Sequence, residues 1–215
     1  MYSPILRPVA RESGFPVAEF GDDSFILRSE MIQDLRVMSY IEQWKYLYEN
    51  RYFHIKMADH SLLVFSEGER PSYSYVHCPL DVVTFAEYLN LIGVADNPSN
   101  RRINQDDYLM VLSTASARSH VTPIRFDYDE RGYEEGVHPV AHIHLGLMNQ
   151  VRISCNRMSP LSFMLFVMRH MYPDSWRRLI GRRSVSSLTG SIRSSKSKIP
   201  VEFAKELDMI ELRCI

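Results

Sequence analysis

Apolar and polar side chains alternate along residues 121–129 and again along residues 138–147, and this period of two predicts the strands of a β-hairpin. The apolar positions of both strands share one face, which predicts its buried side: Ile124, Phe126, Tyr128, Ala141, Ile143, Leu145 and Leu147. The opposite face collects charged and imidazole side chains: Arg125, Asp127, Asp129, His138, His142 and His144. Because the pairing that matches the apolar faces also matches the polar ones, we expect these polar residues to be cross-strand neighbours, about 5 to 8 Å apart between Cβ atoms.

Further periodic segments surround this hairpin. Apolar residues at helical spacing run through residues 29–48, and alternation over residues 52–65 predicts a second hairpin. Residues 73–78 predict another strand, whereas residues 80–92 and 107–117 predict two short helices. Strands and helices are therefore mixed along the chain.

A buried helix is predicted in the last third of the chain. Ser159 is a suitable N-cap and Pro160 suits the first helical position, and we expect the helix to run to Met171. Its apolar residues cover nearly the whole circumference, which predicts burial on all sides. A short helix over residues 174–180 follows and is expected to end at Gly181.

The two ends of the chain give weaker patterns. The first 20 residues are rich in proline and predict irregular structure. Serines and arginines crowd residues 182–199 and predict a flexible segment, and residues 201–215 are apolar enough to dock on the core as a strand or helix. We expect one α+β domain over residues 1–215: a mainly antiparallel β-sheet with a buried helix and flanking helices.

Composition is that of an ordinary globular protein. Hydrophobic residues make up 45% and charged residues 24% of the chain. No run reaches the roughly 18 apolar residues of a membrane span, and the first residues lack the apolar core of a secretory signal. Three widely spaced cysteines argue against a disulfide framework and against a CxxC-type zinc site. We therefore expect a cytoplasmic protein that has no membrane partner.

Charge is distributed unevenly. The formal net charge is -1, but residues 151–199 contain ten lysines and arginines against one aspartate, a local charge of +9. Within them lies what we call the basic segment, an aromatic residue with four arginines: Trp176, Arg177, Arg178, Arg182 and Arg183. Arginine forks and an aromatic platform suit contacts with a nucleic-acid backbone and its bases. A positive surface that faces the acidic remainder of the chain or a protein partner is the alternative, so both partner classes stay open, as does the oligomeric state.

The polar face of the central hairpin supports several chemistries. A carboxylate beside an imidazole fixes its tautomer and raises its basicity, so Asp127 can orient His142 or His144 as a general base. Arg125 can hold a phosphate bidentately, and His138 belongs to the same cluster. Alternatively, the two histidines of the HxH motif can bind one metal ion, with a neighbouring aspartate as third ligand. A structural face of imidazole–carboxylate and guanidinium–carboxylate pairs is the remaining interpretation.

The matching polar faces across the turn shift the preference among these chemistries. HxH alone suggests a metal ligand pair, but the partnership with RFDYD favours acid–base work or structural pairing. No metal site is therefore predicted, and the cofactor stays unassigned.

The order of motifs resembles a family of bacterial proteins catalogued only as a domain of unknown function. The resemblance extends from Arg51 to Trp176 and rests on four stretches: YFHIKMADHSLLVF, PIRFDYD, HPVAHIHLG and MSPLSFMLFVMRHMYPDSW. The RFDYD and HIH strands are also similar, more faintly, to TumE-type toxins of toxin–antitoxin pairs, which carry an aromatic–Asp strand followed by a histidine-rich strand. That similarity singles out five positions: Arg125, Asp127, His138, His142 and His144. It implies a bacterial origin and a place in toxin or phage-defence gene sets, but no established reaction.

Two function hypotheses follow. The first, slightly favoured, is a phosphodiester-directed hydrolase, a nuclease of toxin or phage-defence type. In it His142 or His144 is the general base, Asp127 orients that base, Arg125 clamps the phosphate, and the basic segment holds the nucleic-acid backbone. The second is a non-catalytic module that binds nucleic acid or a protein through the basic segment, with a structural histidine face.

Overall fold

A seven-stranded antiparallel sheet forms the centre of the protein in the computed structural model, which describes residues 2–147, 151–194, 199–203 and 205–209. The strands lie in the sheet in their order along the chain: β1 (Val17–Phe20), β2 (Ile55–Met57), β3 (Leu62–Ser66), β4 (Ser72–Val76), β5 (Ile124–Tyr128), β6 (Ala141–Leu145) and β7 (Val151–Ser154). Helices occupy the connections from β1 to β2 and from β4 to β5, and they also precede β1 and follow β7. This architecture confirms the predicted α+β class with a mainly antiparallel sheet.

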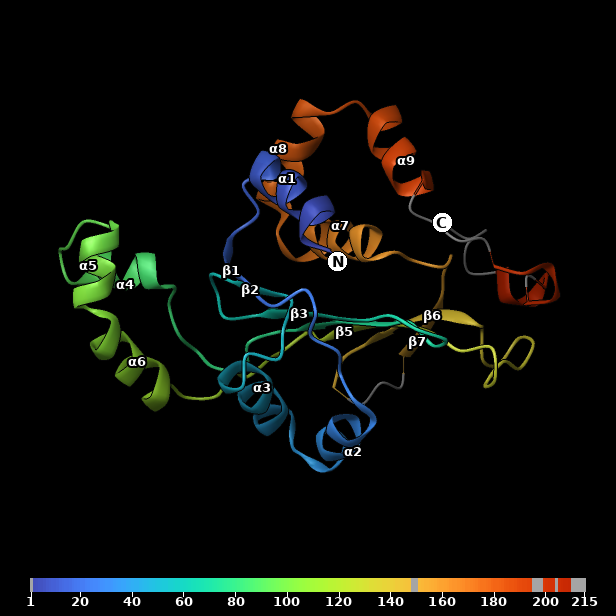
Figure 1. The fold of residues 1–215 in the computed structure, drawn as a ribbon, viewed down its shortest axis with the longest axis horizontal. Helices are drawn as coiled ribbons and strands as arrows, with labels where there is room; N and C mark the ends of the chain where they lie inside the picture. Colours follow the sequence, from blue (N-terminus) through green and yellow to red (C-terminus); the bar gives the residue numbers. More distant parts are fainter. Residues whose placement is uncertain (1, 148–150, 195–198, 204, 210–215) are drawn as a thin grey trace.

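Three helices lie on one side of the sheet (Figure 1), and α8 (Pro173–Arg182) packs on the other two, α1 (Ser3–Ser13) and α7 (Pro160–Met171). Of these, α7 supplies much of the core, and its fully buried Phe163 packs on Tyr73 of β4. Ser159 caps α7 through a reciprocal capping box with Ser162. The predicted buried helix is confirmed from its first residue to its last, whereas α8 continues one residue past the predicted stop at Gly181.

Two helices cover part of the opposite face: α2 (Ser29–Val37) and α3 (Tyr40–Glu49). Trp44 of α3 packs with Leu62 and Val64 of β3 in a second core. The prediction of one helix over residues 29–48 is wrong in one respect, because Ser39 has an extended backbone and caps a separate helix, α3. On this face the helices lie over the first strands, and β5 to β7 present polar side chains beside them.

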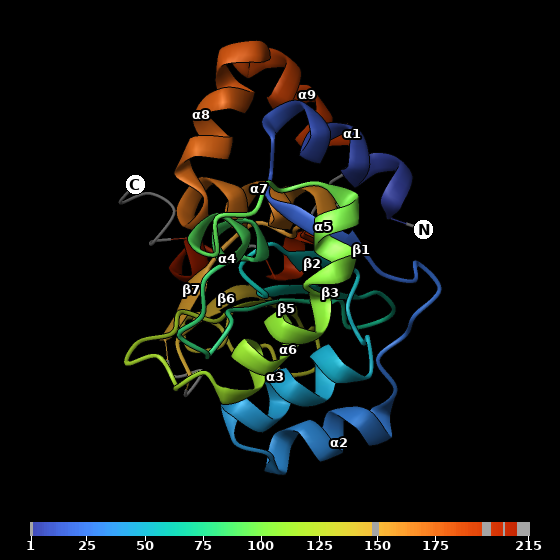
Figure 2. The ribbon, with the colours of Figure 1, turned by 90° about the vertical axis from the view of Figure 1, so that its left-hand side faces the viewer.

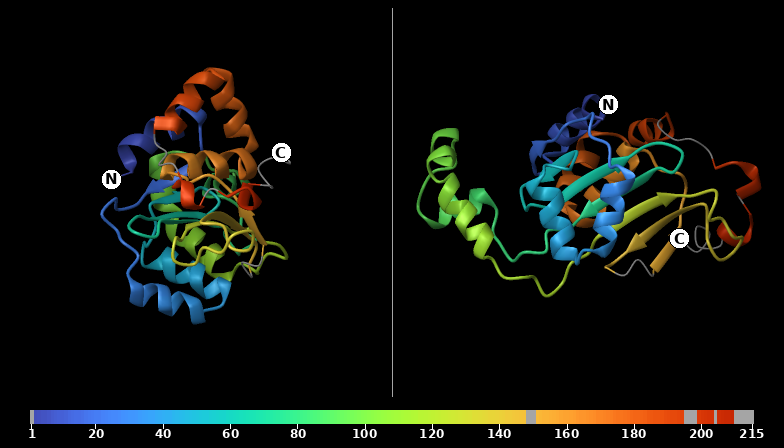
Figure 3. Two further views of the ribbon diagram at one scale, coloured as in Figure 1. Left: turned by 90° about the vertical axis from the view of Figure 1, so that its right-hand side faces the viewer. Right: turned by 60° about the horizontal axis from the view of Figure 1, so that its bottom comes forward.

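Three short helices form an extension beside the sheet (Figures 2 and 3): α4 (Phe85–Leu91), α5 (Pro98–Ile103) and α6 (Gln105–Thr114). The sequence predicts α4 and α6 with shifted ends. α4 begins only at Phe85 because Thr84 caps it in a capping box with Glu87. Tyr108 of α6 hydrogen-bonds His60 in the β2–β3 turn, and this contact ties the extension to the sheet.

The first 20 residues form a helix and a strand, so the prediction of irregular structure is wrong. The buried residues of α1 follow helical spacing: Leu6, Val9, Ala10 and Ser13. Pro4 lies in the first turn, where its missing N–H would be unpaired anyway. Pro8 lies inside the helix, where burial of this apolar face offsets the loss of one hydrogen bond, and Gly14 ends the helix with a φ of 60°. Strand β7 is also absent from the sequence-based predictions.

Helix α9 (Val185–Ser194) lies within the Ser/Arg-rich segment, and its Leu188 is buried against the core. Residues 195–198 lie outside the described residues, and the flexibility of this segment and the single-domain organisation stay predictions. Farther along, Phe203 packs on Tyr133 and Asp208 accepts a hydrogen bond from the Tyr133 hydroxyl, so the described part of the tail docks back as predicted. No helix among the described residues has the length and apolar character needed to cross a bilayer.

Candidate functional site

Strands β5 and β6 pair in the register that the alternation predicts. Arg125 lies opposite His144, and Asp127 lies opposite His142. Between them, Phe126 and Ile143 turn into the core beneath α7. Because successive side chains point to opposite faces of a sheet, the polar ones share the face that carries α2 and α3. The predicted pairing is confirmed, and it builds a compact polar cluster from two short strands.

The flanking strands add polar side chains that the sequence does not single out. On β4, Ser72 lies opposite Asp127, and its Oγ donates a hydrogen bond to Asp127 Oδ1 at 2.7 Å. On β7, Arg152 lies opposite His144. Both neighbours follow from strand pairings that join separate segments, so local periodicity gives no signal for them.

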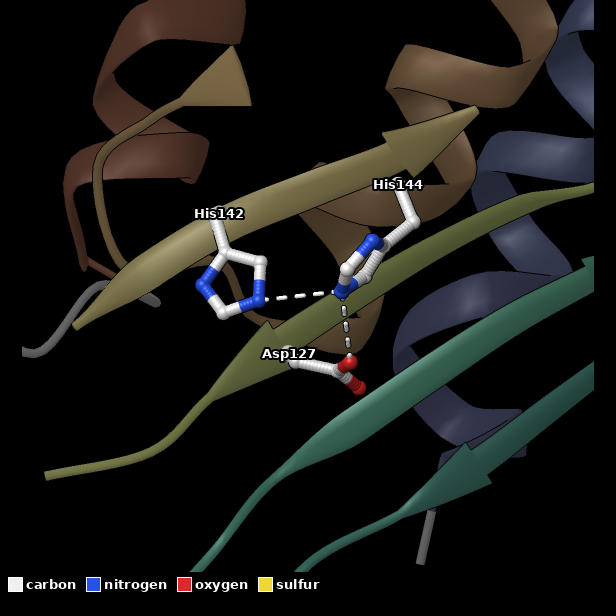
Figure 4. A group of neighbouring side chains, drawn as sticks. All are labelled: Asp127, His142 and His144. Carbon is white, nitrogen blue, oxygen red and sulfur yellow. Dashed lines mark hydrogen bonds and ion pairs between the residues drawn. The ribbon is translucent and has the colours of Figure 1, made fainter. Parts of the chain in front are cut away.

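Three side chains of the cluster direct ligand atoms toward one another (Figure 4). The Nε2 atoms of His142 and His144 are 3.0 Å apart, and His144 Nε2 lies 3.3 Å from Asp127 Oδ2. Both histidines are buried. Arg125 Nε donates to the same Asp127 Oδ2 at 2.8 Å. The ligand atoms of Asp127, His142 and His144 all lie within 4.8 Å of one another, so this group can hold a metal ion.

Hydrogen bonding fixes the protonation of His142. Its Nδ1 lies 2.8 Å from the carbonyl oxygen of Pro139 and must carry the proton, because a carbonyl only accepts. The Nε2 of the neutral ring then keeps its lone pair on the side of His144. Burial lowers the pKa of His142 and outweighs the hydrogen bond to Pro139, which raises it. The neutral imidazole is therefore the favoured form.

Asp127 is the ionised member of the cluster. Burial raises the pKa of Asp127, but the hydrogen bond from His144, the charge of Arg125 and the hydrogen bond from Ser72 together outweigh it and lower the pKa to about 2. The carboxylate is consequently charged at neutral pH, and the guanidinium of Arg125 balances it.

His138 stands beside this cluster. Its ring meets that of His142 edge-on, with centroids 4.8 Å apart. The Nδ1 atom of His138 is buried and has no hydrogen-bond partner within the described structure. Nearby, Asp129 pairs with Arg70 from the β3–β4 turn, with 3.3 Å between Oδ1 and Nε. His138 thus borders the site with an unsatisfied polar atom.

A cleft of about 820 Å³ opens over the cluster, between helices α2 and α3 and strands β4 to β7. All five residues that the sequence assigns to the site line this cleft: Arg125, Asp127, His138, His142 and His144. Aliphatic side chains form its other wall: Leu27, Ile32, Leu35 and Leu47. The cleft also exposes three arginines that the sequence does not single out: Arg36, Arg70 and Arg152. With Arg125 they make four arginines against Asp127 and Asp129, so the described lining has a formal charge of +2.

The basic segment lies on the other side of the sheet, mainly on α8 (Figure 1). Arg178 donates to the carbonyl oxygens of Ser13 and Gly14, at 2.8 and 3.0 Å, where α1 ends. Arg182 donates to the Glu12 carbonyl oxygen at 2.7 Å, and Arg183 pairs with the Glu12 carboxylate. These three arginines therefore bind the end of α1.

The other two members of the basic segment also contact their own chain. Arg177 pairs with Asp174 one turn away at the surface. Trp176 is partly buried against the core, with the guanidinium of Arg169 over its ring. The structure thus brings the five hairpin residues together in one cleft and keeps the basic segment apart from them.

Comparison with known proteins gives a family but no activity. A family model described as "Uncharacterized conserved protein (DUF2290)" matches residues 10–210. The match extends well beyond the Arg51–Trp176 stretch on which the sequence resemblance rests and takes in α2, α3 and most of the tail. Neither the curated proteins nor the solved structures give a match. The chain therefore belongs to the DUF2290 family of uncharacterized conserved proteins.

Proposed function

We propose that this protein is a phosphodiester-directed hydrolase whose substrate binds in the cleft between α2–α3 and β4–β7. The observation that carries the proposal is the convergence of Arg125, Asp127, His142 and His144 on the floor of one concave, positively charged cleft. Clefts with a few convergent polar groups and an apolar wall are typical of small-molecule and substrate sites.

Arginines supply the recognition of the phosphate. Guanidinium groups match phosphate oxygens bidentately and stay charged at all relevant pH values. Asp127 holds Arg125 through Nε, so the two terminal nitrogens of Arg125 are left for a bound anion. Arg152 on the neighbouring strand and Arg36 on α2 line the same cleft. A phosphodiester, which carries one negative charge, suits this balance.

The His142–His144–Asp127 group supplies the place where water is activated. Hydrolysis requires a water molecule to lose a proton as its oxygen attacks phosphorus, so the attacking water must sit against a base or an ion. The neutral His142 and the ionised Asp127 provide lone pairs at one point beside the arginines. This part of the site keeps the residues that the sequence assigns to catalysis.

The basic segment has a different part in this proposal. In the sequence-based hypothesis it holds the nucleic-acid backbone, but its arginines bind α1 across the sheet from the cleft. We therefore assign phosphate binding to Arg125, Arg152 and Arg36. The resemblance to TumE-type toxins supports a bacterial toxin or phage-defence setting for such a hydrolase, and a nuclease is the form of activity that this setting favours.

A cleavage assay tests the proposal. Purified wild type is incubated with single-stranded RNA and with DNA, with and without EDTA, beside His142→Ala and His144→Ala. We expect the cleavage rate to fall by at least about 100-fold in both variants, because each removes a member of the water-activating group. His120→Ala is the matched control, since His120 is an exposed histidine that does not line the cleft. Equal cleavage by all four proteins would remove the proposed site.

A further inference from the structure

The ligand atoms of Asp127, His142 and His144 meet at one point instead of forming a chain. In a proton relay, an imidazole receives a proton at one ring nitrogen and gives it up at the other, so its partners lie on opposite sides of the ring. Here one atom, His144 Nε2, faces both His142 Nε2 and Asp127 Oδ2 (Figure 4). Once His144 Nε2 gives up the proton that it shares with these two partners, three lone pairs converge, and this is the arrangement that a shared cation requires.

The spacing of these atoms fits a metal ion. Ligands placed about 2.0 to 2.1 Å from an ion lie roughly 3.0 Å apart in octahedral and roughly 3.3 Å apart in tetrahedral geometry. The two separations at His144 Nε2 are 3.0 and 3.3 Å. The third pair is within 4.8 Å and shortens with a small shift of the Asp127 carboxylate, which is not fully buried.

Neighbouring groups already orient the ligands. The Pro139 carbonyl accepts the Nδ1–H of His142, and this bond aims the Nε2 lone pair at the shared point. Ser72 binds the Oδ1 atom of Asp127 and leaves Oδ2 on the side of the histidines. Oδ2 accepts from Arg125 Nε and, without an ion, from His144, so an ion that takes the place of the proton on His144 Nε2 meets the lone pair of Oδ2 that this proton occupies.

The chemistry of the ligands selects the class of ion. Imidazole nitrogens suit Zn²⁺ and related transition metals, whereas Mg²⁺ and Ca²⁺ take oxygen ligands. Two histidines and one carboxylate leave further coordination positions open, as catalytic zinc sites do. The ligands lie on the floor of the 820 Å³ cleft, so a water or substrate oxygen can approach from the cleft.

We propose that Asp127, His142 and His144 bind one Zn²⁺ ion at the floor of the cleft. The proposal departs from the sequence-based preference for a metal-free site, and its catalytic part rests on the hydrolase function proposed above. A zinc-bound water loses a proton to solvent, and its oxygen forms a bond to phosphorus. The bond from phosphorus to the leaving oxygen breaks, and that oxygen takes a proton from solvent, so no further reactant is needed.

Zinc binding is measured directly, without reference to cleavage. The full chain is dialysed against a chelator, freed of it, and titrated with ZnCl₂ by calorimetry. We expect one ion per chain, and a loss of affinity on the order of 100-fold in His142→Ala and in His144→Ala. His120→Ala should bind as wild type does. No binding by the wild type, or equal binding by all variants, would overturn the metal site.

A second measurement covers the case in which a histidine variant fails to fold. Co²⁺ replaces Zn²⁺ in sites of this kind, and its visible absorption reports coordination by nitrogen and oxygen in the wild type alone. We expect the absorption to saturate at one Co²⁺ per chain and to disappear on addition of Zn²⁺. Absence of this absorption would contradict the proposal.

The two proposals fail in different ways. Stoichiometric Zn²⁺ binding without cleavage of RNA or DNA would uphold the metal site and contradict the hydrolase. Cleavage that EDTA does not reduce, in a chain that binds no Zn²⁺, would uphold the hydrolase and overturn the metal site.

Discussion

Replacing Arg178 by alanine separates a structural role of the basic segment from a nucleic-acid-binding role. Arg178 Nε donates to the Ser13 carbonyl at 2.8 Å, and Nη2 donates to the Gly14 carbonyl at 3.0 Å. Nη2 also lies 3.1 Å from Ser175 Oγ. The carbonyls at the end of α1 have no partner within the helix, and a cation near them is favourable. Arg178→Ala should therefore destabilise the packing of α1 on α8.

The magnitude follows from the exposure of the contacts. A charge-assisted hydrogen bond contributes about 1.5 to 3 kcal/mol when protected from water. Arg178 is exposed, so solvent screening reduces the sum of its contacts to about 1 to 2 kcal/mol. In a chain of 215 residues, 1 kcal/mol shifts the melting temperature by about 2 to 4 °C. We expect a decrease of about 2 to 8 °C.

Arg177→Ala is the matched control for this measurement. Its ion pair with Asp174 joins side chains that are 72% and 76% exposed, and such pairs contribute at most about 0.5 kcal/mol. Urea unfolding of wild type and both variants gives the free energies to compare. Equal stability of the two variants would refute the structural role of Arg178.

The same pair of variants tests the alternative function. A module that binds nucleic acid through α8 should lose affinity in both variants, with a steep dependence on salt. The structure predicts no loss of affinity for single-stranded RNA in Arg177→Ala. A comparable loss in both variants, without a change in stability, would favour the non-catalytic binding module.

Two further predictions concern stability. Burial lowers the pKa of His60 to about 4 from the 6.5 of an exposed imidazole. Because the unfolded state therefore binds a proton at a higher pH than the folded state, the free energy of unfolding should decrease by up to about 3 kcal/mol as the pH falls through this range. Urea unfolding near neutral pH and near pH 4 measures this decrease, which should be smaller in His60→Asn. An equal decrease in both proteins would show that protonation of His60 is not its cause. Gly21→Ala places a Cβ atom 2.0 Å from the Phe53 carbonyl oxygen, so the backbone must move and the free energy of unfolding should decrease by about 1 to 3 kcal/mol. Thermal unfolding of Gly21→Ala beside Gly190→Ala, whose Cβ meets nothing within 4 Å, checks this, and equal melting temperatures would contradict it.

The sequence predicts best the elements whose signal is local. Alternation over β5 and β6 sorts polar from apolar residues, and the observed register pairs Asp127 with His142 as parity requires. Helix α7 is predicted equally well, because Ser159 and Pro160 indicate where the helix begins and its apolar surface indicates that it is buried. Both elements depend on periodicity and capping within a few residues.

The remaining parts of the site depend on contacts between distant segments. Arg36 reaches the cleft only because α2 packs beside the sheet, and Arg152 only because β7 pairs with β6. Arg178 contacts Gly14 across 164 positions of sequence. A count of charges identifies the basic segment, but it does not show that the arginines of this segment bind α1. In the first 20 residues, the prolines obscure the helical spacing of Leu6, Val9 and Ala10.

A structure of the protein with a non-hydrolysable phosphodiester analogue, such as a dinucleoside phosphorothioate, tests the central claim most directly. We expect the phosphorus group in the cleft, within hydrogen-bonding distance of Arg125 and beside His142 and His144. An analogue bound on the surface of α8, or a cleft that stays empty at saturating analogue, would contradict it.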